Sequence, residues 1–173
     1  MKQLILGGVR SGKSKMAEQQ ALDTGLEVIY IATASAGDGE MQQRIKKHQQ
    51  QRPTNWQLIE EPLMLADALQ QHAKTDHCLL VDCLTLWLTN LLLNEDNTLF
   101  KTQRDAFINT IATLPGQLIF VSNETGLGVV PMGELSRRYC DEAGLLHQQL
   151  AQHCDRVILS VAGLPHVLKG DLF

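Results

Sequence analysis

Apolar residues in this chain gather in short runs that are separated by longer segments with helical spacing. The runs are QLIL (3–6), EVIYIAT (27–33), WQLIE (56–60), CLLVDC (78–83), QLIFVS (117–122) and RVILSV (156–161). Most of them are continuous rather than alternating, which is typical of parallel strands that are buried on both faces. The pattern predicts an α/β fold, with a mostly parallel central sheet and helices on both faces.

The segments between the runs predict the helices. Helical spacing favours helices over 13–24, 38–51, 63–73, 97–113 and 132–153, and the apolar segment 84–94 is compatible with another. The C-terminal segment 162–173 is compatible with a short final strand, whose register Gly163, Pro165 and Gly170 leave open. Since no internal repeat and no Pro/Gly/Ser-rich linker divides the chain, we expect a single domain over 1–173.

Composition narrows the classes of partner. The chain has 173 residues and a formal net charge of −4. No cluster of Lys or Arg resembles a nucleic-acid footprint, so nucleic acid is disfavoured as a partner. The N-terminus leads directly into an apolar strand, without a signal-peptide core or a transmembrane segment. We therefore expect a cytoplasmic protein.

Cysteines and histidines do not form a recognisable metal motif. The four cysteines (78, 83, 140 and 154) include no CxxC pair. The six histidines show neither HExxH nor zinc-finger spacing. We expect reduced thiols within the fold and no structural metal.

The segment GGVRSGKS (7–14) carries the strongest chemical signal. It matches GxxxxGK[ST], follows a predicted strand and opens a predicted helix. In such a loop the backbone N–H groups and the helix N-terminus surround phosphate oxygens, and a side chain at the glycine positions would obstruct them. Lys13 would reach the β- and γ-phosphates, and the Ser14 hydroxyl would help to hold Mg²⁺. The motif predicts a P-loop NTPase-like nucleotide site.

Asp82 is the candidate for the second metal ligand. It ends the apolar run LLVD, and ligands of open α/β sheets bind at the carboxyl ends of the strands. A carboxylate there would hold Mg²⁺ directly or through water. The alternative is a structural Asp that caps the following helix.

Other motifs limit the class of P-loop protein. No NKxD segment is present, and DEAG (141–144) falls within a predicted helix, so a switch GTPase is disfavoured. A small-molecule kinase fits Lys13 and a metal carboxylate. Arg137 and Arg138 could clamp phosphate in such an enzyme, or they could form a solvated helix face.

His48 lies in the segment GDGEMQQRIKKHQQQRP (37–53). If this segment is helical, Met41, Ile45 and His48 share one stripe, and Arg44 and Arg52 lie one turn to either side of the imidazole. These positions alone leave His48 open between a catalytic and a structural role.

Several segments together resemble one enzyme family. They are the phosphate loop, IATA (31–34), RIKKHQQQRP (44–53), WQLIEEP (56–62), LLVDCLTLWLTNLL (79–92) and VSNETGLGVVP (121–131). In this order they resemble the bifunctional adenosylcobinamide kinase / adenosylcobinamide-phosphate guanylyltransferase family of cobalamin biosynthesis. The resemblance covers almost the whole chain.

The resemblance implies a two-step enzyme. In the family a nucleoside triphosphate, ATP or GTP, phosphorylates the aminopropanol hydroxyl of adenosylcobinamide. GMP from GTP is then transferred to the new phosphate through a guanylyl-histidine, which gives adenosylcobinamide-GDP and pyrophosphate. The resemblance also implies Mg²⁺ as cofactor and a homo-oligomer, with a trimer known in the family.

The family's functional residues carry over by position. The histidine of RxxxHxxxRP corresponds to His48, and Lys13 is the second catalytic residue. The resemblance places nucleotide contacts at Gly7, Gly8, Val9, Arg10, Ser11, Gly12, Lys13, Ser14, Thr33, Ala34, Ser35, Gln50, Gln51, Arg52, Pro53, Glu60 and Asp82, with Ser14 and Asp82 at Mg²⁺. Asp82 stands where relatives also have Glu, which leaves direct or water-mediated ligation open.

Two other functions remain compatible with the residues. One is a plain small-molecule kinase in which His48 is inert. The other is a nucleotide-binding regulatory protein that hydrolyses slowly and acts through its bound state.

Overall fold

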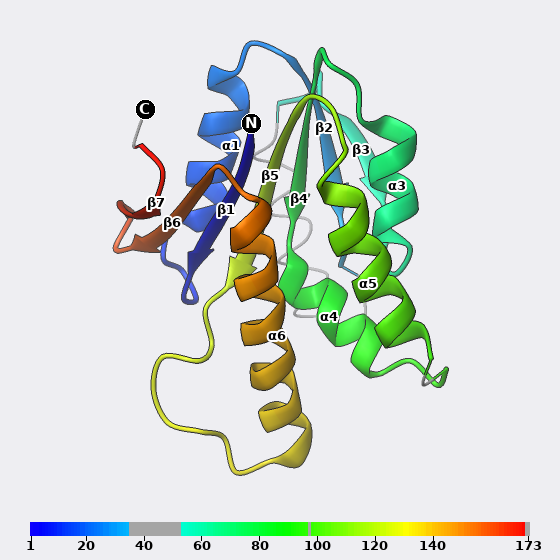
Figure 1. Ribbon diagram of the computed structural model, residues 1–173. Coiled ribbons are helices and arrows are strands. Elements are labelled where there is room, and N and C mark those ends of the chain that lie inside the picture. Colours follow the sequence, from blue (N-terminus) through cyan, green and yellow to red (C-terminus); the bar gives the residue numbers. More distant parts are fainter. Residues whose placement is uncertain (35–52, 97, 172–173) are drawn as a thin grey trace.

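The computed structural model describes residues 1–34, 53–96 and 98–171. Their strands form one seven-stranded sheet in the order β3-β2-β4-β5-β1-β6-β7 (Figure 1). The strands are β1 (Lys2–Gly7), β2 (Glu27–Ala32), β3 (Gln57–Glu60), β4 (His77–Asp82), β5 (Gln117–Asn123), β6 (Arg156–Val161) and β7 (Leu164–Lys169). Every neighbouring pair is parallel except β6 with β7. The predicted mostly parallel sheet is confirmed.

The described helices agree with the predicted ones. They are α1 (Lys13–Asp23), α3 (Leu65–His72), α4 (Leu84–Leu92), α5 (Leu99–Ile111) and α6 (Glu134–His153). Each lies within a predicted range, including the apolar segment 84–94. The helix predicted over 38–51 lies outside the described residues. None of the described helices is long and apolar enough to cross a membrane.

Helices cover both faces of the sheet because neighbouring side chains of a strand point to opposite faces. Leu4 and Leu6 of β1 pack in the larger apolar cluster with α3, α4, α5 and α6. Ile5, between them, packs in the smaller cluster with Ala17 and Ala21 of α1. In Figure 1, α1 lies on the side of the sheet away from α4, α5 and α6. The predicted two-sided covering is thus confirmed.

The final strand is an antiparallel addition at the sheet edge. A two-residue turn, Ala162 and Gly163, joins β6 to β7, and both residues have positive φ (52° and 78°). These angles match the type I′ turn that favours tight hairpins. Pro165 pairs with Ser160, and an edge strand tolerates proline because it needs only one row of hydrogen bonds. The structure therefore fixes the register that the sequence left open.

The carboxyl ends of the central parallel strands lie together along one end of the sheet. Ala32 of β2 pairs with Glu60 of β3 and with Asp82 of β4. Gly7 of β1 pairs with Asn123 of β5, the strand between β1 and β4. The phosphate loop and the predicted metal carboxylate therefore lie at the same edge of the sheet.

Candidate nucleotide-binding site

The phosphate loop joins β1 directly to α1. The backbone of Arg10 has φ 55°, and Gly12, the N-cap residue of α1, has φ 94°. Left-handed residues curl a short segment so that its amide groups can surround an anion. The positive end of the helix dipole adds attraction for phosphate at the same place. The predicted strand–loop–helix context of the motif is confirmed.

Two of the loop glycines are required by protein contacts. A Cβ at Gly7 would lie 2.4 Å from Ser11 Oγ and 2.6 Å from the carbonyl oxygen of Ser160. A Cβ at Gly12 would lie 3.0 Å from Gly163 Cα, on a left-handed backbone. Clearance for phosphate is therefore not the whole reason for these glycines. At Gly8, by contrast, a Cβ would have no described atom within 4 Å.

The C-terminal hairpin holds the loop in place. The Ser11 carbonyl accepts hydrogen bonds from Ser160 Oγ (2.9 Å) and from the backbone N–H of Gly163 (2.8 Å). Ser160 is buried, so its hydroxyl is shielded from competing water. On the other side, the N–H of Glu124 donates to the Gly7 carbonyl (3.1 Å). The loop is thus fixed by the end of β6 and the turn after it on one side, and by the residue that follows β5 on the other.

Lys13 and Ser14 occupy the first turn of α1. The Lys13 ammonium donates to the Gly8 carbonyl at 3.2 Å, so it lies across the loop. Ser14 is partly exposed. An ammonium beside the loop amides is positioned to neutralise the oxygens of a bound triphosphate.

Asp82 ends β4 beside Tyr30 of β2. The Tyr30 hydroxyl donates to Asp82 Oδ2 at 3.0 Å, which fixes the orientation of the carboxylate. The N-cap residue of α4 is Cys83, and no side chain caps that helix. The alternative of Asp82 as the helix cap is therefore wrong.

The Cys83 thiol, next to Asp82, has a pKa that depends on the charged groups of the site. Desolvation, and to a smaller extent the Asp82 carboxylate, raise the pKa of Cys83 to about 11, while the Lys13 ammonium acts in the opposite direction. The thiol therefore stays protonated at neutral pH. Because both charges act on the same side chain, Asp82 and Lys13 belong to one electrostatic environment.

Thr33 has a structural role at the end of β2. Its buried hydroxyl donates to the Cys83 carbonyl (2.6 Å) and accepts from the Cys83 N–H (3.1 Å). Its carbonyl accepts from Asn90 Nδ2 at 2.8 Å. These bonds tie the residue after β2 to the N-cap and to the last turn of α4, so the Thr33 side chain is already engaged within the protein.

The remaining predicted nucleotide contacts divide into two groups. Ala34 and Pro53 are partly exposed, and Glu60 is exposed at the end of β3, the strand farthest from β1 on that side of the sheet. The other predicted contacts, Ser35, Gln50, Gln51 and Arg52, lie outside the described residues. The predicted nucleophile His48 also lies outside them. Of the predicted site residues, the structure places the phosphate loop and Asp82 at the same carboxyl-terminal end of the sheet.

Sequence reasoning missed the polar residues around the end of β5. Asn123 pairs with Gly7, and its N–H donates to Thr85 Oγ1 at 2.8 Å. His147 Nε2 and Ser122 Oγ are 2.8 Å apart in a buried contact, and burial lowers the pKa of His147. The strand-end rule that selected Asp82 would also have selected Asn123.

Arg137 and Arg138 are engaged within the α6 region. Arg137 donates to the carbonyls of Pro131 and Met132, just before α6. The Arg138 guanidinium lies 5.8 Å from the centroid of the Phe100 ring. Both contacts favour a structural role over a phosphate clamp.

The residues present fit Mg²⁺ rather than a soft metal. All four cysteines are free. Within the described ranges, no group of three or more His, Cys, Asp and Glu residues could hold a metal ion. The Ser14 hydroxyl and the Asp82 carboxylate offer hard oxygen ligands, which Mg²⁺ accepts together with phosphate oxygens and water.

Comparisons with known proteins agree with this site. Residues 3–168 match the family model of cobinamide kinase / cobinamide phosphate guanyltransferase. The chain is 60% identical over 171 residues to the bifunctional adenosylcobalamin biosynthesis protein CobP of Pseudomonas aeruginosa, covering 99% of each. It is 34% identical over 179 residues to the bifunctional adenosylcobalamin biosynthesis protein CobU of Escherichia coli, covering 96% of this chain and 98% of that one.

Solved structures support the fold alone. A prototypical ATPase from the type III secretion system of pathogenic bacteria superposes with a TM-score of 0.55 at 10% identity, covering 96% of this chain and 56% of the ATPase. This likeness confirms the predicted P-loop NTPase-like fold.

Proposed function

Because this chain belongs to the cobinamide kinase / cobinamide phosphate guanyltransferase family, we propose that it phosphorylates adenosylcobinamide and then guanylylates the product. The chain is a bifunctional enzyme of adenosylcobalamin biosynthesis, with a kinase and a nucleotidyltransferase activity. The observation that supports the two proposed transfers is the anchored phosphate loop, with Asp82 at the same carboxyl-terminal end of the parallel strands.

In the proposed kinase step, the loop 7–14 holds the triphosphate and Lys13 neutralises its terminal oxygens. The acceptor hydroxyl attacks the γ-phosphorus and loses its proton as the bond to the bridging oxygen breaks. A nucleoside diphosphate leaves. Ser14 and Asp82 would hold Mg²⁺, which supplies charge neutralisation on the phosphate oxygens.

In the proposed second step, an imidazole nitrogen of His48 attacks the α-phosphorus of GTP and pyrophosphate leaves. A phosphate oxygen of adenosylcobinamide phosphate then attacks the same phosphorus and releases the imidazole, which gives adenosylcobinamide-GDP. The covalent intermediate divides one difficult displacement into two easier ones. Ser35, Gln50, Gln51, Arg52, Pro53 and Glu60 are the proposed further contacts to nucleotide. A cytoplasmic homo-oligomer, with a trimer by resemblance, is part of the proposal.

The test is a pair of histidine variants. The protein is incubated with α-labelled GTP, denatured and counted. Wild type should retain label that is lost in acid and kept in alkali, because a P–N bond is acid-labile. His48→Asn should retain no label and should accumulate adenosylcobinamide phosphate. His166→Asn, at an exposed position of β7, is the matched control and should behave as wild type.

Four outcomes would contradict the proposal. Acid-stable label, or full labelling of His48→Asn, would identify a different nucleophile. Phosphorylation of cobinamide without protein labelling in wild type would favour the plain kinase. A regulatory nucleotide-binding protein would give neither transfer.

A further inference from the structure

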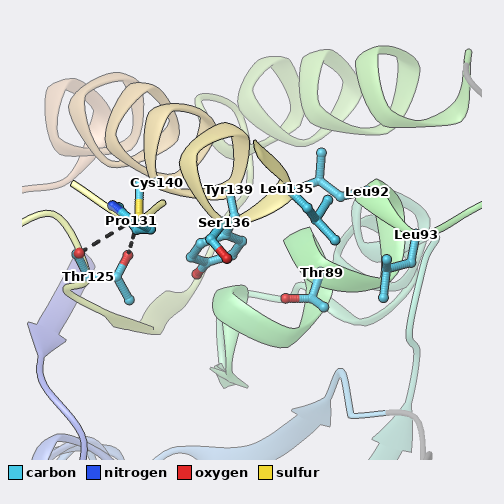
Figure 2. Close-up of a pocket in the computed structure, with 9 residues that line it drawn as sticks. All are labelled: Thr89, Leu92, Leu93, Thr125, Pro131, Leu135, Ser136, Tyr139 and Cys140. Carbon is cyan, nitrogen blue, oxygen red and sulfur yellow. Dashed lines mark hydrogen bonds between the residues drawn. The ribbon is translucent and has the colours of Figure 1, made fainter. Parts of the chain in front are cut away.

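A pocket of about 320 Å³ lies between α4, α6 and the segment 124–133 (Figure 2). Leu92 of α4 and Leu93, the C-cap residue of that helix, face it from one side, and Leu135 and Tyr139 of α6 from the other. The lining also includes Thr125. None of the nine described lining residues is charged. The pocket is therefore unsuited to a triphosphate and suited to an uncharged, largely apolar group.

The segment 124–133, which contributes Thr125 and Pro131 to the pocket, is unusually apolar for an exposed segment. Val129 and Met132 are 95% and 96% exposed, and Leu127 and Val130 are exposed as well. Four large apolar side chains exposed within six consecutive residues favour a binding surface over isolated exposed residues. These four residues and the pocket together are called the apolar platform below.

The apolar platform is connected to the phosphate loop. Glu124, at the start of the segment, donates its N–H to the Gly7 carbonyl. Inside the pocket, the Tyr139 hydroxyl is buried and lies near Thr85, whose own hydroxyl accepts the Asn123 N–H. Asn123 in turn is the register partner of Gly7. The inner wall of the pocket is therefore continuous with the edge at which the nucleotide would bind.

The inference rests on the function proposed above: we propose that the apolar platform binds the corrinoid acceptor, with the aminopropanol arm extended toward the phosphate loop. A corrinoid is broad, carries ring methyl groups and uncharged amide arms, and is too large for the pocket to enclose. One edge of it would fill the pocket, and the hydroxyl groups of Thr89 and Ser136 are suited to its amides. A nucleotide triphosphate is highly charged and does not match this uncharged, largely apolar lining.

The test uses two leucines of α6 that are equally exposed. Leu135 lines the pocket and Leu145 does not, and each is 50% exposed. Leu135→Asp places a carboxylate against the acceptor and should weaken cobinamide binding by about tenfold or more. Binding is measured by equilibrium dialysis with cobinamide and without nucleotide. Leu145→Asp should bind as wild type, and KM for ATP should be unchanged in both variants.

A second variant separates pocket filling from charge. Ser136→Phe occupies pocket volume while making the surface more apolar, and it should also raise the KM for cobinamide. If both pocket variants bind cobinamide as wild type does, the proposal is overturned. If they lose binding only because an oligomer dissociates in sedimentation, the surface joins copies of the chain and the proposal is also overturned.

The same measurements distinguish this proposal from the function on which it rests. Wild-type protein that binds cobinamide through the platform but transfers neither phosphoryl nor guanylyl groups contradicts the proposed function and supports the platform. Both transfers with an unchanged cobinamide KM in the pocket variants contradict the platform alone.

Discussion

Replacing Gly7 by alanine is expected to destabilise the protein through one added methyl group. The new Cβ would lie 2.4 Å from Ser11 Oγ and 2.6 Å from the Ser160 carbonyl oxygen. The serine side chain could rotate, but the carbonyl belongs to the backbone of β6, which is paired with β1. Overpacking of this kind typically costs about 1–3 kcal/mol. With a urea slope of about 2 kcal/mol per molar, the unfolding midpoint should fall by about 0.5–1.5 M.

The adjacent glycine provides the matched control. A Cβ at Gly8 would have no described atom within 4 Å, so Gly8→Ala should leave the free energy of unfolding within about 1 kcal/mol of wild type. Urea unfolding followed by circular dichroism measures both variants under the same conditions. Equal midpoints for Gly7→Ala and Gly8→Ala would refute the argument that Gly7 is fixed by contact with Ser160.

Three further predictions concern charges. Lys13→Ala should impair both group transfers without unfolding the protein, since one loop serves both steps; survival of either transfer in a labelled-nucleotide assay would require a second nucleotide site. Asp82→Asn should raise the Mg²⁺ concentration needed for half-maximal turnover, and a Mg²⁺ titration identical to that of wild type would exclude Asp82 as the ligand. Burial lowers the pKa of His147 below its usual 6.5, so its contribution to stability is present above pH 6.5 and lost as pH falls toward the lowered pKa. Urea unfolding at about pH 7.5 and 5.5 should show this loss in wild type and a smaller one in His147→Gln, whereas equal losses would exclude His147 as the cause.

Local features of the sequence predicted most of the fold. Continuous apolar runs identified most of the first six strands because parallel strands inside the sheet are buried on both faces, and β3 is the exception, since it lies at the sheet edge and is largely exposed. Leu4, Ile5 and Leu6 illustrate the point, since each contacts one of two opposite apolar clusters. The phosphate loop was equally predictable, because its signal is a fixed spacing of residues within one turn.

Contacts between distant segments could not be predicted in the same way. The sequence indicated glycine at positions 7 and 12 for phosphate, but the contacts of these residues with Ser160 and Gly163 depend on a strand pairing that no local pattern reveals. Thr33 is a second example. Its hydroxyl is hydrogen-bonded to Cys83, a contact that no local pattern reveals, and the nucleotide contact that the resemblance implies at Thr33 stays a prediction.

The anchoring of Ser11 by the C-terminal hairpin has a consequence for synthesis of the protein. The Ser160 hydroxyl that holds the Ser11 carbonyl is supplied 149 residues later in the chain. During translation the loop therefore emerges long before its support does, and a nascent or truncated chain that ends before β6 lacks both donors to that carbonyl. The loop therefore acquires its support from the C-terminal hairpin only when synthesis of the chain is almost finished.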